Sequence, residues 1–219
     1  MRLVLVLRPE PGAAATLERA RKLGLNSIAV PLFEVEPVEW EVPDPSVYDA
    51  LLLTSANVVR HGGEGLQALR GLQAYAVGDA TARAAREAGF DVASIGGGGV
   101  DDLLRSVDPT LKLLHLCAED RTRADTPQPI TQVVVYRSRE LADAGSIPAD
   151  CAALIHSPRA ARRFAELVQD RSGIAIAAIS PQAAEAVGGG WEAVQTAEVP
   201  TDDALLALVA RLCDKSPAG

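Results

Sequence analysis

Asp49-Ala-Leu-Leu-Leu-Thr-Ser-Ala-Asn57 has a counterpart further along the chain, Asp150-Cys-Ala-Ala-Leu-Ile-His-Ser-Pro158, which places Ser55 on Ser157, 102 positions later. In both stretches an apolar run ends in a serine and is followed by a helix-forming segment. Repeats of stacked arrays recur every ~20–50 residues, so this longer spacing predicts two related lobes. Two further pairs follow in the same order: Ala76-Val-Gly-Asp-Ala80 with Ala178-Ile-Ser-Pro-Gln182, and Asp101-Asp-Leu-Leu104 with Asp202-Asp-Ala-Leu205.

The two copies differ in length, and the difference predicts how the lobes are connected. The first copy continues into two more apolar runs, Leu111–Leu116 and Ile130–Tyr136, whereas the second stops after its 202–213 helix. The N-terminus supplies a matching β-α-β unit, with apolar runs at 3–7 and 28–30. We therefore expect a discontinuous lobe, an inserted lobe and two inter-lobe linkers of exposed extended chain, rich in proline or acidic residues. The discontinuous lobe is expected to consist of 1–32 and 148–219, and the inserted lobe of 46–132. The two linkers are expected at 33–45 and 133–147.

The expected strands are short and almost wholly apolar, and they alternate with segments of helical periodicity. Strands of this kind are covered on both faces, so the pattern predicts an α/β fold in which each lobe is an open parallel sheet flanked by helices. Ligands of such folds bind at the carboxyl edge of the sheet, and two facing edges would form a cleft. The runs are Leu51–Leu53, Ala74–Val77, Leu111–Leu116, Ala152–Ile155 and Ile174–Ile179.

Composition limits the class of protein. The 219 residues are 48% hydrophobic and 4% aromatic, which suits two modest aliphatic cores. A net charge of −8 without a basic stripe argues against nucleic acid binding. No apolar run approaches the ~18 residues of a membrane span, and Leu3–Leu7 is too short for a signal peptide, so a cytoplasmic protein is expected. The three cysteines stand singly and predict no metal site, and a monomer is expected because few aromatic residues are free for an interface.

Hydroxyl residues and glycine recur where the expected strands end. Thr54 and Ser55 follow one strand, Gly78 and Thr81 the next, and Ser157 the equivalent strand of the second copy. Such residues cap helices, and the positive end of a helix also favours anions. Helix capping alone and a site for carboxylates both fit this pattern. Motifs for nucleotide phosphates, serine hydrolysis and zinc are absent, and His61 and His115 are expected to be structural.

Four blocks in this order resemble the uroporphyrinogen-III synthase family over essentially the whole chain, from Arg8-Pro9 to the C-terminal helix. They are Asp49–Asn57, Val77–Ala82, Val134–Tyr136 and Ile155–Pro158. The resemblance implies an enzyme of tetrapyrrole (haem) biosynthesis that cyclises hydroxymethylbilane to uroporphyrinogen III, inverting the last pyrrole ring and eliminating water. It also implies a cyclising hydro-lyase that uses no metal or organic cofactor.

The resemblance assigns roles to individual residues. It places Tyr136 at a functional tyrosine, where a phenol of pKa ~10 would donate a proton; the alternative is an ordinary strand tyrosine. It places Gln182 and Ala183 where the family has hydroxyl residues, and the Gln182 amide would still be able to donate. Arg8 and Arg137 are added because the substrate is acidic. The expected carboxylate-binding residues are Thr54, Ser55, Gly78, Thr81, Ser157, Gln182, Ala183, Arg8 and Arg137.

Two other functions stay open at this stage. One is a catalytically weak or silent tetrapyrrole-binding member of the family, favoured by Gln182 and Ala183. The other is a two-lobed binding protein for a small anion, which the connection of the lobes also allows. For the synthase, a small-molecule tetrapyrrole substrate and its hand-over from the upstream bilane-forming enzyme are expected, with no nucleic acid or membrane partner.

Overall fold

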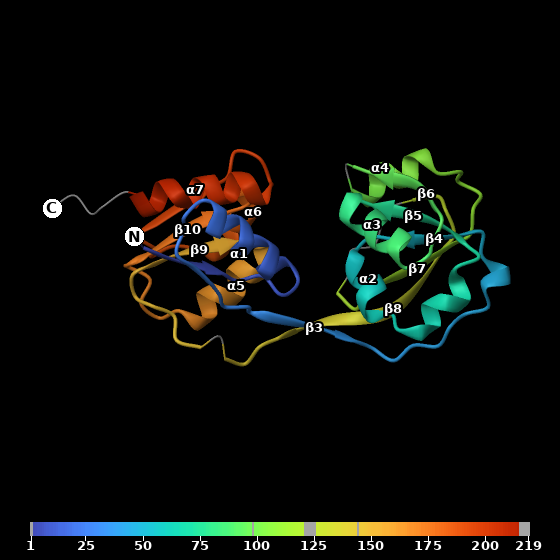
Figure 1. Ribbon diagram of the computed structural model, residues 1–219, viewed down its shortest axis with the longest axis horizontal. Coiled ribbons are helices and arrows are strands. Elements are labelled where there is room, and N and C mark those ends of the chain that lie inside the picture. The colour runs from blue at the N-terminus through green and yellow to red at the C-terminus, as the bar shows by residue number, and fades with distance from the viewer. Residues whose placement is uncertain (1, 98, 121–125, 144, 215–219) are drawn as a thin grey trace. The chain divides into compact units, whose positions relative to one another are not determined.

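The computed structural model describes residues 2–97, 99–120, 126–143 and 145–214, and the chain divides into two compact units (Figure 1). Unit 1 consists of Met1–Glu34 and Glu140–Gly219, and unit 2 of Val35–Arg139. The chain therefore passes from unit 1 to unit 2 and back once.

Unit 1 contains a five-stranded sheet with the order β11-β10-β9-β1-β2, in which all neighbours are parallel. Strands from the N-terminus thus extend the sheet formed by strands from the C-terminal part. β1 pairs directly with β9, with Val6 opposite Leu154. The strands are β1 (Leu3–Val6), β2 (Ser27–Ala29), β9 (Cys151–Ile155), β10 (Ile174–Ala178) and β11 (Ala193–Thr196).

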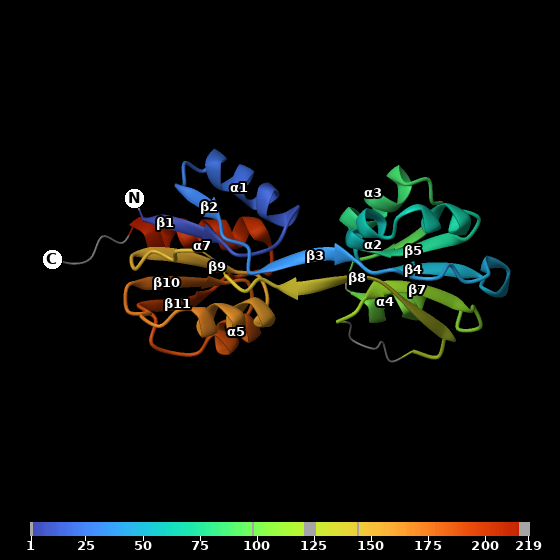
Figure 2. The same ribbon diagram turned by 90° about the horizontal axis from the view of Figure 1, so that it is seen from below.

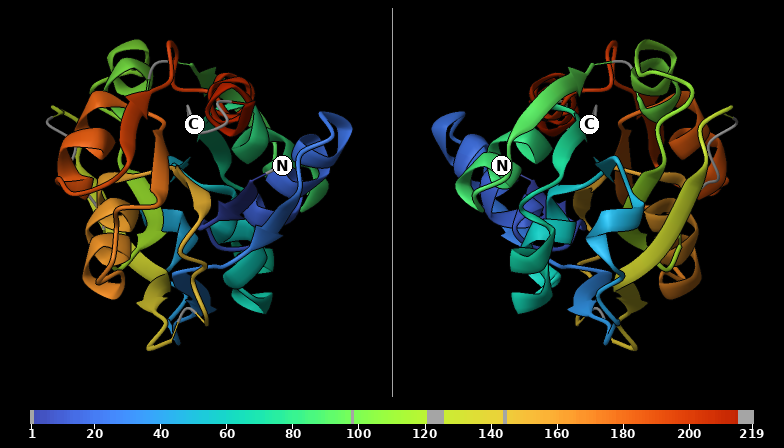
Figure 3. Two further views of the ribbon diagram at one scale, coloured as in Figure 1. Left: turned by 90° about the vertical axis from the view of Figure 1, so that its left-hand side faces the viewer. Right: turned by 90° about the vertical axis from the view of Figure 1, so that its right-hand side faces the viewer.

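Helices cover both faces of this sheet, as the left view of Figure 3 shows. Successive side chains of a strand point to opposite faces. Leu5 and Leu7 pack with α5 (Pro158–Leu167) and α6 (Pro181–Val187), whereas Val4 and Val6 pack with α1 (Gly12–Lys22) and α7 (Asp202–Asp214). The almost continuous apolar runs of these strands follow from burial on both sides.

Unit 2 contains a six-stranded sheet with the order β3-β8-β7-β4-β5-β6. Helices α2 and α3 pack on one face with the 3₁₀ segment η2, and α4 packs on the other. The strands are β3 (Phe33–Pro37), β4 (Ala50–Leu53), β5 (Gln73–Val77), β6 (Val92–Gly96), β7 (Leu113–Ala118) and β8 (Ile130–Glu140). The helices are α2 (Ala56–His61), α3 (Asp79–Glu87), α4 (Val100–Ser106), η1 (Pro45–Val47) and η2 (Glu64–Leu69).

The α/β fold class is confirmed, and the two sheets repeat one another. The order β11-β10-β9-β1-β2 in unit 1 corresponds to β6-β5-β4-β7-β8 in unit 2. β4 and β9 are the strands that carry the first pair of repeated blocks, and each is the middle of the five. The duplication in the sequence is therefore a duplication of one sheet with its helices.

Parts of the two ranges expected to be inter-lobe linkers, 33–45 and 133–147, form paired strands. Residues 33–37 instead form the edge strand β3, and β8 continues to Glu140. β3 runs opposite to β8, so the second sheet is mixed rather than wholly parallel (Figure 2). The backbone N–H of Val38 donates to the Val135 carbonyl at 3.0 Å. Pairing satisfies backbone groups that an isolated linker would leave to water.

The length and apolarity of the described helices determine whether one of them could cross a membrane. None of the helices in the described residues is both long and apolar enough to cross a lipid bilayer.

Candidate functional site

The carboxyl edge of the unit 2 sheet brings together Thr54, Ser55 and Gly78. Leu53 lies opposite Ala76 in the β4–β5 pair, so the residues that follow on the two strands lie side by side. The Ser55 hydroxyl accepts the Asn57 backbone N–H at 3.2 Å and caps α2. Sequence reasoning from parallel strands predicted this proximity, and the capping is present in the structure.

Thr54 has a partner that the sequence did not reveal. Its Oγ1 lies 3.1 Å from Nε2 of His115, which is 5% exposed within β7. Leu53 pairs with Leu116, so β4 and β7 are direct neighbours. His115 is buried, and its contact with Oγ1 holds the Thr54 side chain at the sheet edge.

Gly78 and Thr81 belong to the turn into α3. Gly78 has φ of +78°, a conformation that residues with a side chain rarely adopt. A Cβ added to Gly78 would meet no atom within 4 Å, so its backbone conformation, not crowding, favours glycine there. Thr81 lies in the first turn of α3 and is only 5% exposed. The Gly78 backbone is therefore the more accessible group of this pair.

A β-bulge determines where Tyr136 points. Cys117 pairs with Val134, but Ala118 pairs with Tyr136, so Val135 is an additional residue in β8. Val135 and Tyr136 would otherwise face opposite sides of the sheet, yet both pack in the core beneath α2 and α3. The bulge thus brings Tyr136 to the face of the sheet that is covered by α2, the helix that Ser55 caps.

The surroundings of Tyr136 keep its phenol protonated. Burial raises the pKa of Tyr136, and the Ser55 side chain opposes this in part, so that the pKa stays above its usual value of 10.0. The ring lies 6.2 Å from that of His61, measured between centroids. A buried, protonated phenol can donate a proton at neutral pH and does not titrate there.

The serines of unit 1 repeat the capping seen in unit 2. Ser157 accepts the Ala160 N–H at 3.1 Å and caps α5, and Ser180 accepts the Ala183 N–H at 3.3 Å and caps α6. Gln182 is exposed. Ala183 is fully buried, and its N–H donates to Ser180, so its side chain packs in the core of unit 1.

Arg137 has an acidic partner. Its Nε donates to Oε1 of Glu36 at 2.6 Å, and Arg139 lies 3.5 Å from the other oxygen of the same carboxylate. The hydrogen bond from Arg137 holds the pKa of Glu36 below its usual value. Both side chains are partly exposed, so a carboxylate ligand would compete with Glu36 for Arg137.

A cluster around Asp202 in unit 1 was not predicted. The Asp202 carboxylate accepts hydrogen bonds from Thr16 at 3.0 Å, Arg19 at 2.7 Å and His156 at 2.8 Å, and Arg8 lies 3.7 Å away. Burial raises the pKa of Asp202, but the bonds from His156, Arg19 and Thr16 outweigh it and lower the pKa to about 2. These residues are far apart in sequence, and only knowledge of the strand order would have grouped them.

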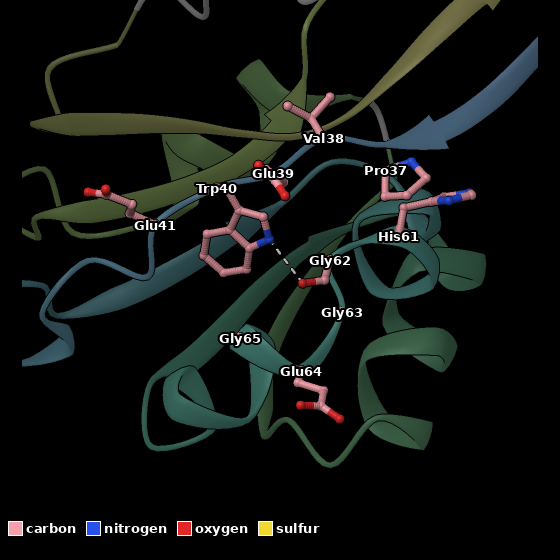
Figure 4. Close-up of a pocket in the computed structure, with 10 residues that line it drawn as sticks. All are labelled: Pro37, Val38, Glu39, Trp40, Glu41, His61, Gly62, Gly63, Glu64 and Gly65. Atoms are coloured by element: carbon pink, nitrogen blue, oxygen red, sulfur yellow. Dashed lines mark hydrogen bonds between the residues drawn. The ribbon is translucent and has the colours of Figure 1, made fainter.

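A pocket of about 750 Å³ lies in unit 2, between the chain after β3 and the end of α2 (Figure 4). Trp40 is one of the lining residues, and its Nε1 donates to the Gly62 carbonyl at 3.0 Å. Glu39, Glu41 and Glu64 are among the lining residues, which makes the pocket acidic. None of the expected carboxylate-binding residues lines it. In the described part of the chain, no group of three or more His, Cys, Asp or Glu side chains is placed to hold a metal ion.

Comparisons with known proteins agree with one another. The family model described as uroporphyrinogen-III synthase HemD matches residues 14–207. A curated uroporphyrinogen-III synthase of Chlorobaculum parvum (strain DSM 263 / NCIMB 8327) is 36% identical over 61 residues, which are 27% of this chain. The match spans only 25% of that relative's length.

Solved structures extend the likeness in fold to nearly the whole chain. Uroporphyrinogen-III synthetase from Helicobacter pylori 26695 superimposes with a TM-score of 0.69 at 19% identity, over 97% of this chain and 100% of that one. A mutant uroporphyrinogen III synthase from the extremely thermophilic bacterium Thermus thermophilus gives 0.54 at 18% identity, over 99% and 100%. At these identities the likeness shows the fold.

Proposed function

Since the chain belongs to the uroporphyrinogen-III synthase family, whose model matches residues 14–207, we propose that it converts hydroxymethylbilane into uroporphyrinogen III. The reaction closes a linear tetrapyrrole with eight carboxylate side chains, inverts the last pyrrole ring and releases water. We propose further that the protein is a cyclising hydro-lyase that uses only its own side chains and backbone.

The single observation that carries the proposal is the Tyr136 phenol. It is 8% exposed, and burial raises its pKa and keeps it protonated. Departure of the substrate hydroxyl needs a proton, because water leaves more readily than hydroxide. Tyr136 donates this proton to the leaving oxygen, and the substrate becomes a delocalised azafulvenium cation.

Ring closure through the substituted carbon of the last pyrrole gives a spiro intermediate, which fragments and recloses in the inverted orientation. The enzyme must hold a flexible chain so that this strained closure is faster than the simpler one. Binding energy from many carboxylates provides that orientation. We assign carboxylate binding to Thr54, Ser55, Gly78 and Thr81 in unit 2 and to Arg8, Ser157 and Gln182 in unit 1.

Hydroxyls and backbone N–H groups suit this task because a helix N-terminus favours anions without a formal positive charge. Arg137 is a weaker candidate, since Glu36 already binds it. The protein acts as a monomer in the cytoplasm and takes its substrate from the bilane-forming step. Size-exclusion chromatography with light scattering tests the oligomeric state.

The test is a product analysis. The protein is supplied with freshly generated hydroxymethylbilane, the products are oxidised, and the type I and type III uroporphyrin isomers are separated by chromatography. A dominant type III isomer is expected. Type I alone, as in the reaction without enzyme, would contradict the proposal.

A catalytically silent tetrapyrrole binder is the second candidate, and the buried Ala183 favours it, because a hydroxyl side chain is missing there. The same product analysis separates the two functions. A silent binder would bind uroporphyrin III and yield only the type I isomer.

A further inference from the structure

We propose that Arg8 forms a carboxylate-binding subsite at the carboxyl edge of the unit 1 sheet, with Asp202 and Gly12 as its positioning residues and His156 beside it. The proposal rests on the proposed function, because the ligand is one acidic side chain of the tetrapyrrole. It adds three residues that neither the sequence nor the family likeness had assigned.

Strand register places Arg8 beside His156. Val6 lies opposite Leu154 in the β1–β9 pair, and Arg8 and His156 each follow by two residues. Both leave the sheet at its carboxyl edge, where ligands of parallel sheets bind. His156 is followed by Ser157, the cap of the ten-residue helix α5. A ligand at Arg8 therefore lies close to a helix N-terminus as well.

The Asp202 carboxylate holds Arg8 in place without occupying its donors. Thr16, Arg19 and His156 all donate hydrogen bonds to this carboxylate. Arg8 Nη1 stays 3.7 Å from it, an ion pair that is too long for a hydrogen bond. Arg8 makes no side-chain hydrogen bond with any described residue, and its side chain is 36% exposed. Its guanidinium N–H groups are thus available for a carboxylate.

The acidic side chains at the starts of α1 and α7 have partners of their own. The exposed Asp203 lies 3.7 Å from Arg19 Nε, and Glu10 accepts the Ala14 N–H at 3.0 Å at the start of α1. Arg19 is therefore shared between two carboxylates. Arg19 donates one hydrogen bond to Asp202, whereas Arg8 makes no side-chain hydrogen bond with a described residue.

The absence of a side chain at Gly12 leaves the space that the Arg8 guanidinium occupies. A Cβ on Gly12 would lie 2.7 Å from Arg8 Cζ and 2.9 Å from Nη2, and closer still to Nε. These distances are shorter than van der Waals contact allows. Gly12 has no positive φ, so alanine would fit the backbone and displace only the guanidinium.

The Nδ1 atom of His156 is a second polar group near Arg8 that lacks a hydrogen-bond partner among the described residues. Because Asp202 is ionised, it accepts, and Nε2 of His156 must carry the hydrogen of their 2.8 Å bond. The side chain is 9% exposed, and Nδ1 is buried with no hydrogen-bond partner among the described residues. A buried ring nitrogen without a partner is costly, and a carboxylate could pair with Nδ1 only if that nitrogen also carried a hydrogen.

The experiment compares Arg8→Gln, Gly12→Ala and the control Gly189→Ala. Gly189 lies in unit 1, has no positive φ, and a Cβ there would meet nothing within 4 Å. The probe is uroporphyrin III, which carries the eight carboxylates of the product, and its dissociation constant is measured by calorimetry at two salt concentrations. Circular dichroism checks that each variant folds.

Arg8→Gln is expected to weaken binding by about 10- to 100-fold, as for loss of a charge-assisted hydrogen bond, and to reduce its salt dependence. Gly12→Ala is expected to fall between Arg8→Gln and wild type, and Gly189→Ala to match wild type. Equal affinity in wild type, Arg8→Gln and Gly12→Ala would overturn the subsite, as would a wild type that does not bind the probe.

The same variants separate this proposal from the proposed function. If wild type yields only the type I isomer while Arg8→Gln still weakens binding, the synthase activity fails and the subsite stands. If wild type yields the type III isomer and Arg8→Gln binds as wild type does, the activity stands and the subsite fails.

Discussion

The Ser55 side chain lowers the pKa of the Tyr136 phenol, although β7 separates the strands that lead to these two residues. The same Ser55 hydroxyl caps α2. One serine therefore links the start of a helix to the proposed proton donor, and the two roles can be separated by experiment.

Tyr136→Phe is expected to lower kcat by about 100-fold with a small change in KM, because the proton donor is lost while the ring remains. Steady-state kinetics with hydroxymethylbilane measures this. Tyr75→Phe is the matched control, since Tyr75 also lies on a unit 2 strand but packs on the face covered by α4. Equal rates for the two variants would contradict the role of Tyr136.

Ser55→Ala is expected to destabilise the protein by about 1 kcal/mol through loss of the cap, and to raise the pKa of Tyr136 further. The sign of the pKa change follows because Ser55 lowers the pKa of the phenol, so that removing the Ser55 hydroxyl raises it. Urea unfolding and ultraviolet difference titration measure the two effects. Ser180→Ala, which removes only the cap of α6, should destabilise similarly and leave the Tyr136 titration unchanged.

Asp202→Asn is expected to lose about 2 kcal/mol of stability at neutral pH, because the folded-state pKa of about 2 lies below the usual 3.8. A carboxyl group whose pKa is lowered by folding stabilises the folded state at pH values above its pKa in the unfolded chain. This contribution decreases as the pH falls toward 2. Urea unfolding at pH 7 should show the full difference from wild type, and at about pH 3 roughly half of it. A difference independent of pH would argue against an ionised Asp202 at the centre of the cluster.

Phe164→Ala is expected to cost about 4 kcal/mol, since Phe164 is fully buried and stacks on Trp191 with ring centroids 5.3 Å apart. Denaturation followed by tryptophan fluorescence measures it. Leu23→Ala, at a side chain that is 57% exposed, should change the unfolding free energy by less than about 0.5 kcal/mol. Similar losses in both variants would mean that the core is not where the buried side chains place it.

The sequence predicted the regular part of the fold well, because apolar runs and a repeated order of elements are local signals. It placed strand ends, and with them Ser55 and Gly78, at one edge of a sheet. It did not predict the edge strand β3, because pairing with β8 depends on a partner far along the chain rather than on local apolarity.

The site was predicted less completely for the same reason. The orientation of Tyr136 depends on one additional residue in β8, and a bulge leaves no mark in the hydrophobic pattern. Asp202 was recognised only as the start of a helix. Its bonds to Thr16 and His156 join three elements that become neighbours only after the sheet of unit 1 is assembled.

The position of β1 in the interior of its sheet has a consequence for synthesis on the ribosome. β1 pairs with β2 on one side and β9 on the other, so the nascent chain cannot complete this sheet until residues beyond 151 have emerged. Unit 2 is contiguous, from Val35 to Arg139, and all of it emerges earlier. Unit 2 is therefore fully synthesised while β1 and β2 still lack the partner strands of unit 1. Until those strands are synthesised, the apolar surface of β1 and β2 stays exposed.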